Sequence, residues 1–198
     1  MKQYDLDRLR LFKCFDETVK TYFDFLKQKQ YMFCKIREGH IVYSSLMVNI
    51  EIYYERISFE IYLEITLKKQ NISCSIDEII KSQHFLQWKR VYTSATTEKT
   101  ICKSVSEIAE ILQSIGSKYI DGDIEAFRIV QTKKNAEHNV LLLKKRLSDA
   151  EKRATLSWRN KDYAEVIKAY NPIYEYLTPT QRRKLEYCIR EQSTNNPS

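Results

Sequence analysis

The residues with the clearest chemical potential are carboxylates and tyrosines in two stretches that alternate apolar and polar side chains. Glu60 and Glu64 share one strand face with Tyr62 between them, which suits an acid–base pair. Glu51 and Tyr53 join them on the outer surface if the two stretches pair as a hairpin. Tyrosine offers a large contact area at low entropic cost, so these five residues are also typical of a protein-binding patch. A solvated face, or one covered by a helix, is the alternative explanation.

A second pattern is a basic stripe on a long helical segment. Leu141–Ser198 carries 12 of the 33 Lys and Arg residues but only 7 of the 26 Asp and Glu residues. At about 100° per residue, one arc of the segment is apolar and the opposite arc carries four cations, namely Lys134, Lys145, Lys152 and Arg159. Such a stripe can follow a phosphate backbone or an acidic partner. A solvated outer face is the alternative, because acidic residues interleave with the bases and no aromatic residue joins the stripe.

Nucleotide and metal chemistry have little support in the sequence. Only three glycines occur in 198 residues, and no two of them could form a phosphate-cradling loop, so nucleotide binding by a glycine-rich loop is excluded. The histidines His40, His84 and His138 are far apart, and none has a second ligand at helical or hairpin spacing. Asp121–Glu125 resembles the start of a calcium loop, but its glycine occupies the second position instead of the sixth. We therefore expect neither a cofactor nor a metal ion.

The cysteines and serines show no catalytic motif. The five cysteines are odd in number and never spaced C-x-x-C, which predicts reduced thiols and a cytoplasmic location. No Gly-x-Ser-x-Gly elbow occurs, although a site assembled from distant residues leaves no local motif. No apolar stretch approaches the roughly 20 residues that a bilayer span needs. We expect a protein that is not an enzyme and does not enter a membrane.

The periodicity of apolar residues predicts an α+β fold. Helical spacing runs from Asp5 to about Lys29. Strict alternation over Val48–Tyr54 and Phe59–Leu67 indicates antiparallel strands with one solvated face. Shorter candidates at Tyr31–Ile36 and Ile41–Ser45 extend this pair to a meander of about four strands. The helical half that follows contains one long helix and a terminal helical hairpin, and strands followed by helices favour α+β over a doubly wound sheet.

The order of these elements predicts a single domain over residues 1–198 with a subdomain seam near residue 96. The helix and sheet occupy 1–96, and the helical half occupies 97–191. An edge strand near Lys89–Tyr92 is a further candidate. Thr178, Pro179 and Gln181 predict the N-terminus of the last helix. The polar tail 192–198 is expected to be frayed.

The C-terminal segment resembles a recurrent type of sequence. Its pattern of small, aromatic and aliphatic residues between Ala154 and Tyr187 is similar to the C-terminal ends of many small, uncharacterised bacterial α+β proteins. The pattern comprises Ala154, Trp158, Asp162, Tyr163, Val166, Tyr170, Ile173, Leu177, Thr178, Lys184, Leu185 and Tyr187. Some relatives of that kind are thought to be immunity proteins of toxin systems. The resemblance implies packing positions and no functional residue.

These observations favour a bacterial, cytoplasmic protein that binds another protein, for example a toxin that it neutralises. The alternative is a nucleic-acid-associated accessory protein that binds through the basic stripe. An enzyme with a non-local active site ranks third. Binding through the stripe would weaken steeply with salt, whereas a tyrosine-centred interface would survive moderate salt.

Overall fold

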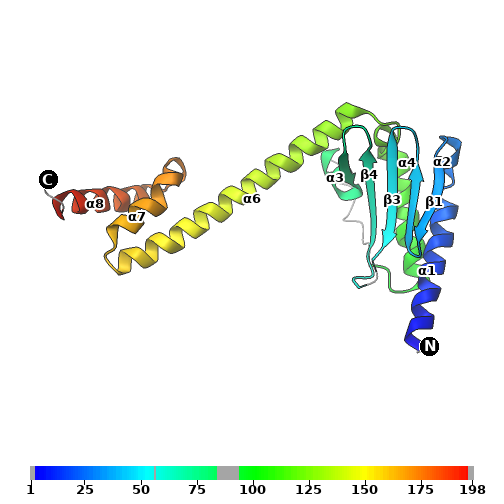
Figure 1. The fold of residues 1–198 in the computed structure, drawn as a ribbon, viewed down its shortest axis with the longest axis horizontal. Coiled ribbons are helices and arrows are strands. Elements are labelled where there is room, and N and C mark those ends of the chain that lie inside the picture. Colours follow the sequence, from blue (N-terminus) through cyan, green and yellow to red (C-terminus); the bar gives the residue numbers. More distant parts are fainter. Residues whose placement is uncertain (1–2, 56, 84–93, 196–198) are drawn as a thin grey trace. The chain divides into compact units, whose positions relative to one another are not determined.

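The computed structural model describes residues 3–55, 57–83 and 94–195, and it has the α+β fold that the sequence predicts (Figure 1). The predicted strand near Lys89–Tyr92 and the side chain of His84 lie outside these residues. The chain divides into two compact units, Met1–Lys134 and Asn135–Ser198. We call them unit 1 and unit 2 and describe each by itself.

Unit 1 contains a five-stranded antiparallel sheet in the order β1-β2-β3-β4-β5, one strand more than the sequence predicts. The strands are β1 (Met32–Arg37), β2 (His40–Ser44), β3 (Val48–Tyr54), β4 (Ile61–Leu67) and β5 (Ile72–Ser75). Burial alternates strictly along β3 and β4, because successive side chains of a strand point to opposite faces. One face of the sheet therefore supplies the core, and the other carries polar side chains.

The apolar face is covered by α1 (Gln3–Tyr22) and α4 (Glu98–Ile115), which pack against each other and against the central strands (Figure 1). Phe15 and Val19 of α1 and Val105 and Ile108 of α4 belong to the same buried cluster as Ile50 of β3. The other helices wholly within the described residues of unit 1 are α2 (Phe25–Gln28), α3 (Ile76–Ser82) and α5 (Ser117–Ile120). Ser75 and Glu78 form a capping box at the start of α3.

The predicted seam near residue 96 is not where the units divide. The stripe of α4, from Ile101 to Leu112, completes the core of the sheet and does not begin a separate helical half. The boundary between Lys134 and Asn135 falls instead inside α6 (Ile124–Arg159). The physical reason is that one face of a five-stranded sheet needs more apolar cover than α1 alone supplies.

Unit 2 is a small helical bundle. The C-terminal part of α6 packs with α7 (Tyr163–Tyr170), the 3-10 helix η1 (Asn171–Tyr176) and α8 (Pro179–Asn195). Its buried residues are Ala150, Ala154, Val166, Ala169, Tyr170, Ile173, Leu177, Leu185 and Cys188. Helix α8 continues four residues beyond the end predicted at Glu191, and the hydroxyls of Ser193 and Thr194 donate to carbonyls one turn earlier in this last segment.

We expect Tyr43→Phe to stabilise unit 1. Tyr43 is fully buried in the core, and its hydroxyl finds no hydrogen-bond partner among the described residues. Removing an unpaired buried hydroxyl should raise the free energy of unfolding by about 1 kcal/mol. Chemical denaturation of the two proteins at neutral pH measures this difference, and a loss of stability in the variant would show that the hydroxyl has a partner.

The same substitution should also change the response to alkaline pH. Burial, and then the carboxylate of Asp24, raises the pKa of Tyr43 to about 12. Because the folded state holds the phenol proton more tightly than the unfolded state, this group leaves the free energy of unfolding unchanged below about pH 10. That free energy falls as pH rises from about 10 toward 12, where the buried hydroxyl ionises. The advantage of Tyr43→Phe should therefore grow above pH 10, by up to about 2 kcal/mol. If the free energies of unfolding of the two proteins differ by the same amount above and below about pH 10, the raised pKa of Tyr43 is contradicted.

Candidate functional site

The outward-facing residues of β3 and β4 bring the predicted carboxylates and tyrosines together. Antiparallel pairing sets Glu51 opposite Glu64 and Tyr53 opposite Tyr62. Glu60 lies just before β4 and accepts a hydrogen bond from the Tyr62 hydroxyl. We call these five residues the Tyr–Glu face. Its strands lie side by side in the middle of the sheet (Figure 1), so a rigid scaffold fixes the spacing of its side chains.

The two tyrosines form a flat aromatic surface on this face. Their ring centroids are 5.1 Å apart and their planes differ by 23°, a stacked arrangement that cross-strand neighbours favour. The edge of the ring pair is extended by His40, whose ring lies 5.9 Å from that of Tyr53. Tyr62 remains 37% exposed. Among the described helices, α1 and α4 cover the opposite, apolar face of the sheet, so the ring pair stands on the polar side.

The carboxylates give the face a negative character. Glu51 and Glu64 are like charges at directly opposed positions, which destabilises a strand pair. Burial raises the pKa of the Tyr53 hydroxyl, and the carboxylates of Glu64, Glu51 and Glu55 raise it further. The hydrogen bond to Glu60 is the main cause that raises the pKa of Tyr62. Both phenols therefore stay neutral at physiological pH and can donate hydrogen bonds.

One histidine and one lysine lie near these carboxylates. His40 Nε2 lies 3.2 Å from Glu51 Oε2. Lys134, at the end of unit 1, pairs with Glu78 of α3 at 2.9 Å, and Glu78 and Glu64 together raise the pKa of its ammonium group. Of these two residues, Lys134 is the permanent cation, and it already contacts Glu78. The carboxylates of Glu51, Glu60 and Glu64 therefore give the face a potential that attracts a cation from a partner.

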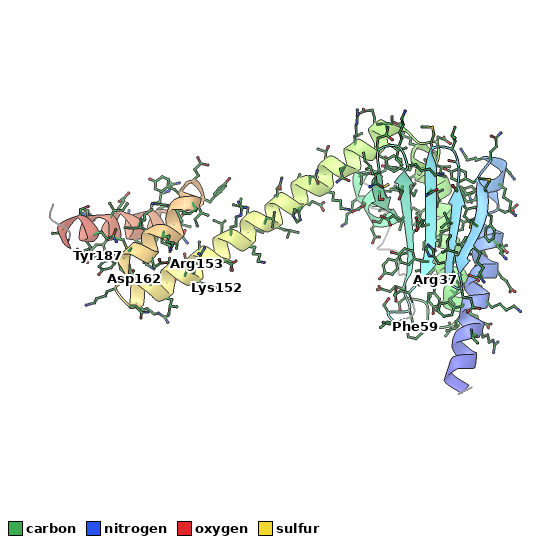
Figure 2. All side chains as sticks on the ribbon, in the orientation of Figure 1. Arg37, Phe59, Lys152, Arg153, Asp162 and Tyr187 are labelled. Atoms are coloured by element: carbon green, nitrogen blue, oxygen red, sulfur yellow. The ribbon has the colours of Figure 1, made fainter. Side chains whose placement is uncertain are left out.

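A groove adjoins the aromatic surface at the end of the sheet where β1 and β2 connect. Tyr53 lines it together with Arg37, Glu38 and Glu55, and its volume is about 580 Å³. Arg37 is labelled in Figure 2. A side chain of a partner could enter this groove while the rest of the partner lies on the rings. Sequence reasoning missed both the groove and His40, although continuing the alternation of β3 into β2 would have placed His40 on the polar face.

Two of the carboxylates of the face have close neighbours within the sheet. Tyr62 holds Glu60 by a hydrogen bond, and Glu64 lies opposite another carboxylate. No group of three His, Cys, Asp or Glu side chains able to hold a metal ion occurs within the described residues. In the same part of the chain, no helix is long and apolar enough to cross a membrane.

The four predicted cations do not lie on one unit. Lys134 belongs to unit 1, where its charge is paired with Glu78. The other three, Lys145, Lys152 and Arg159, belong to the part of α6 within unit 2 and are exposed. Lys152 is labelled in Figure 2 beside Arg153. Pairing with a residue 56 positions earlier could not be read from helical periodicity, so the stripe is shorter than predicted.

Unit 2 also carries an aromatic cluster that sequence reasoning assigned only to the core. The rings of Trp158, Tyr163 and Tyr187 contact one another edge to face, with centroids 5.4 to 6.0 Å apart. The ammonium group of Lys184 lies 5.0 Å from the centre of the Trp158 ring. Asp162, which is labelled in Figure 2, caps α7 and directly precedes Tyr163 of this cluster. The close ring spacing leaves no room for a ligand between the rings, so the cluster is a packing element.

Comparison of the chain with known protein families, with curated proteins and with solved structures found no match.

Proposed function

We propose that this chain is a non-enzymatic protein-binding protein and that its Tyr–Glu face binds a partner with a cationic surface. The observation that carries the proposal is the stacked Tyr53–Tyr62 pair, flanked by Glu51, Glu60 and Glu64, on the polar side of a rigid sheet. A cationic toxin that the chain neutralises is one partner of this class.

The physical argument combines contact area with charge. Tyrosines at the centre of an interface contribute much of its binding free energy because they bury a large surface with little loss of rotamer freedom. An Arg or Lys of the partner placed between Glu51 and Glu64 would also relieve the repulsion of that like-charged pair. The free protein is thus destabilised locally in a way that binding corrects, and this favours a cationic partner over an acidic one.

The charge argument predicts opposite effects on folding and on binding. Glu51→Gln combined with Glu64→Gln should leave the free protein as stable as the wild type or more stable, because the opposed charges are removed. Capture of the partner from nuclease-treated lysate of the native host should fall about tenfold or more, since charge-assisted hydrogen bonds are lost. The variant and the wild type are compared as equal amounts of tagged protein.

The matched control for this experiment reverses charges on unit 2. Lys145→Glu with Lys152→Glu should capture the same partner as the wild type, because neither residue belongs to the Tyr–Glu face. Equal capture by the Gln variant and the wild type would contradict the proposal.

A role in nucleic-acid binding is the second candidate, because Lys145, Lys152 and Arg159 are exposed along one side of α6 and have no ion pair within the described residues. Positive residues of this kind bind phosphates and release counterions, so affinity would fall steeply with salt. Recovery of nucleic acid by the wild type, and its loss in Lys145→Glu with Lys152→Glu, would favour this candidate over the sheet face.

A further inference from the structure

Helix α6 carries an apolar seam with the spacing of a coiled coil, and the bundle of unit 2 buries only one end of it. The seam residues recur at alternating intervals of four and three, and within unit 2 they are Ala136, Val140, Leu143, Leu147, Ala150 and Ala154. Ala150 and Ala154 are fully enclosed by the bundle, and Leu147 packs against it. The seam therefore continues beyond the part of α6 that α7 and α8 enclose.

The uncovered part of the seam is exposed and adjoins a groove. Val140 is 51% exposed and its neighbour Leu141 is 64% exposed. Val140 and Leu143 line a groove of about 380 Å³ whose other wall is formed by Ile173 and Tyr176 of η1. Apolar residues of this size in a regular seam are typical of a helix that packs against another helix.

The charges beside the seam make this stretch complementary to itself. Glu137 and Lys144 are one heptad apart and therefore lie on the same flank of the helix. In the sequence, Glu137 precedes Val140 and Lys144 follows it. Both side chains are exposed, and neither forms an ion pair within the described residues. If two such stretches run antiparallel, Val140 of one packs beside Leu143 of the other. The same register brings Glu137 of each stretch near Lys144 of the other, so that two opposite-charge contacts form by symmetry.

We propose that a second copy of this chain docks on the seam, with the two α6 segments antiparallel about a two-fold axis near Val140. The surface involved lies wholly within unit 2, so the proposal is independent of the Tyr–Glu face. A uniformly acidic partner helix would repel Glu137, and a uniformly basic one would repel Lys144. A second copy presents both charges and can pair with both residues. Few helical turns are involved, so the dimer should be of moderate affinity, roughly micromolar.

The experiment uses charge reversal in the full chain and sedimentation velocity over a range of concentrations. Glu137→Lys alone places four like charges at the two contacts, and Lys144→Glu alone does the same with the opposite sign. Each should raise the dissociation constant about tenfold. The double variant should recover the affinity of the wild type, and an equimolar mixture of the two single variants should form a mixed dimer. In that mixed dimer both contacts are attractive, which no interaction within one chain can reproduce.

An apolar substitution and its control complete the test. Val140→Asp should abolish the dimer, because it buries a charge in the seam. Leu156→Asp is the matched control, since Leu156 is also an exposed leucine of α6, 63% exposed, but lies off the seam. A wild-type chain that stays monomeric at about 0.1 mM would overturn the proposal. So would a dimer that both single variants retain, or one that the mixture fails to restore. Far-UV circular dichroism confirms that each variant is folded.

Discussion

Tyr53→Ala is expected to weaken binding of the captured protein partner by about thirtyfold, or about 2 kcal/mol. Tyr53 occupies the centre of the Tyr–Glu face: it stacks on Tyr62, contacts His40 and lines the adjacent groove. Truncation removes one ring and leaves the second without its neighbour, so Tyr62→Ala should have a similar effect. The two losses should not add, because each substitution disrupts the same stacked pair.

The measurement is titration of the identified partner by calorimetry, with each variant first shown to melt like the wild type. Tyr53→Phe separates the ring from the hydroxyl and should retain most of the affinity if contact area dominates. Tyr22→Ala is the matched control, because Tyr22 is an exposed tyrosine of α1 outside the Tyr–Glu face. An affinity unchanged in both Tyr53→Ala and Tyr62→Ala would remove the sheet face from the binding site.

Part of the Tyr–Glu face can be predicted from the alternation of apolar and polar residues alone. Alternation in β3 and β4 is sufficient to place Glu51, Tyr53, Tyr62 and Glu64 on the polar side, because the opposite choice would expose residues such as Ile50 and Leu63. The stacking of Tyr53 on Tyr62 requires the register as well. A shift of that register by one residue would have inverted the burial of β4.

Other features were beyond sequence reasoning because they depend on contacts between distant residues. The strand β5 has only four residues, too few for alternation to be recognised. The apolar residues of α4 indicate that the helix has a buried face but not which surface that face covers. The boundary between the sheet and the helical half was therefore predicted near residue 96. Lys134 fits a basic stripe by periodicity, yet its position beside Glu78 is set by the packing of α3.

Tyr170→Ala is expected to have the largest effect on stability and should lower the free energy of unfolding by about 3–5 kcal/mol. Tyr170 is fully buried in unit 2, and its hydroxyl donates to Glu151 Oε2 at 2.8 Å. The same carboxylate accepts hydrogen bonds from Gln181 of α8 and from Thr155 of α6. Glu151 thus links α6 to the end of α7 and the start of α8, so the loss combines a cavity with a broken polar network.

Tyr170→Phe tests the network apart from the cavity. Removing a hydrogen bond to a charged acceptor should cost about 1.5–3 kcal/mol. Burial alone would raise the pKa of Glu151, but the hydrogen bonds from Tyr170, Gln181 and Thr155 outweigh it and lower the pKa. The stability from this lowered pKa is present above about pH 4.5 and is lost as pH falls through the folded-state value. In Tyr170→Phe this acid-sensitive contribution should shrink.

Tyr43→Phe and Tyr170→Phe make the same chemical change at two buried tyrosines. They should change the free energy of unfolding in opposite directions. Both residues are fully buried, and the partners of their hydroxyls distinguish them: none among the described residues for Tyr43, and a carboxylate for Tyr170. Urea unfolding followed by circular dichroism and by tryptophan fluorescence, to which Trp158 of unit 2 contributes, measures both variants in the full chain. If Tyr170→Phe were neutral, the Glu151 network would not stabilise unit 2, and apolar packing alone would have to account for its fold.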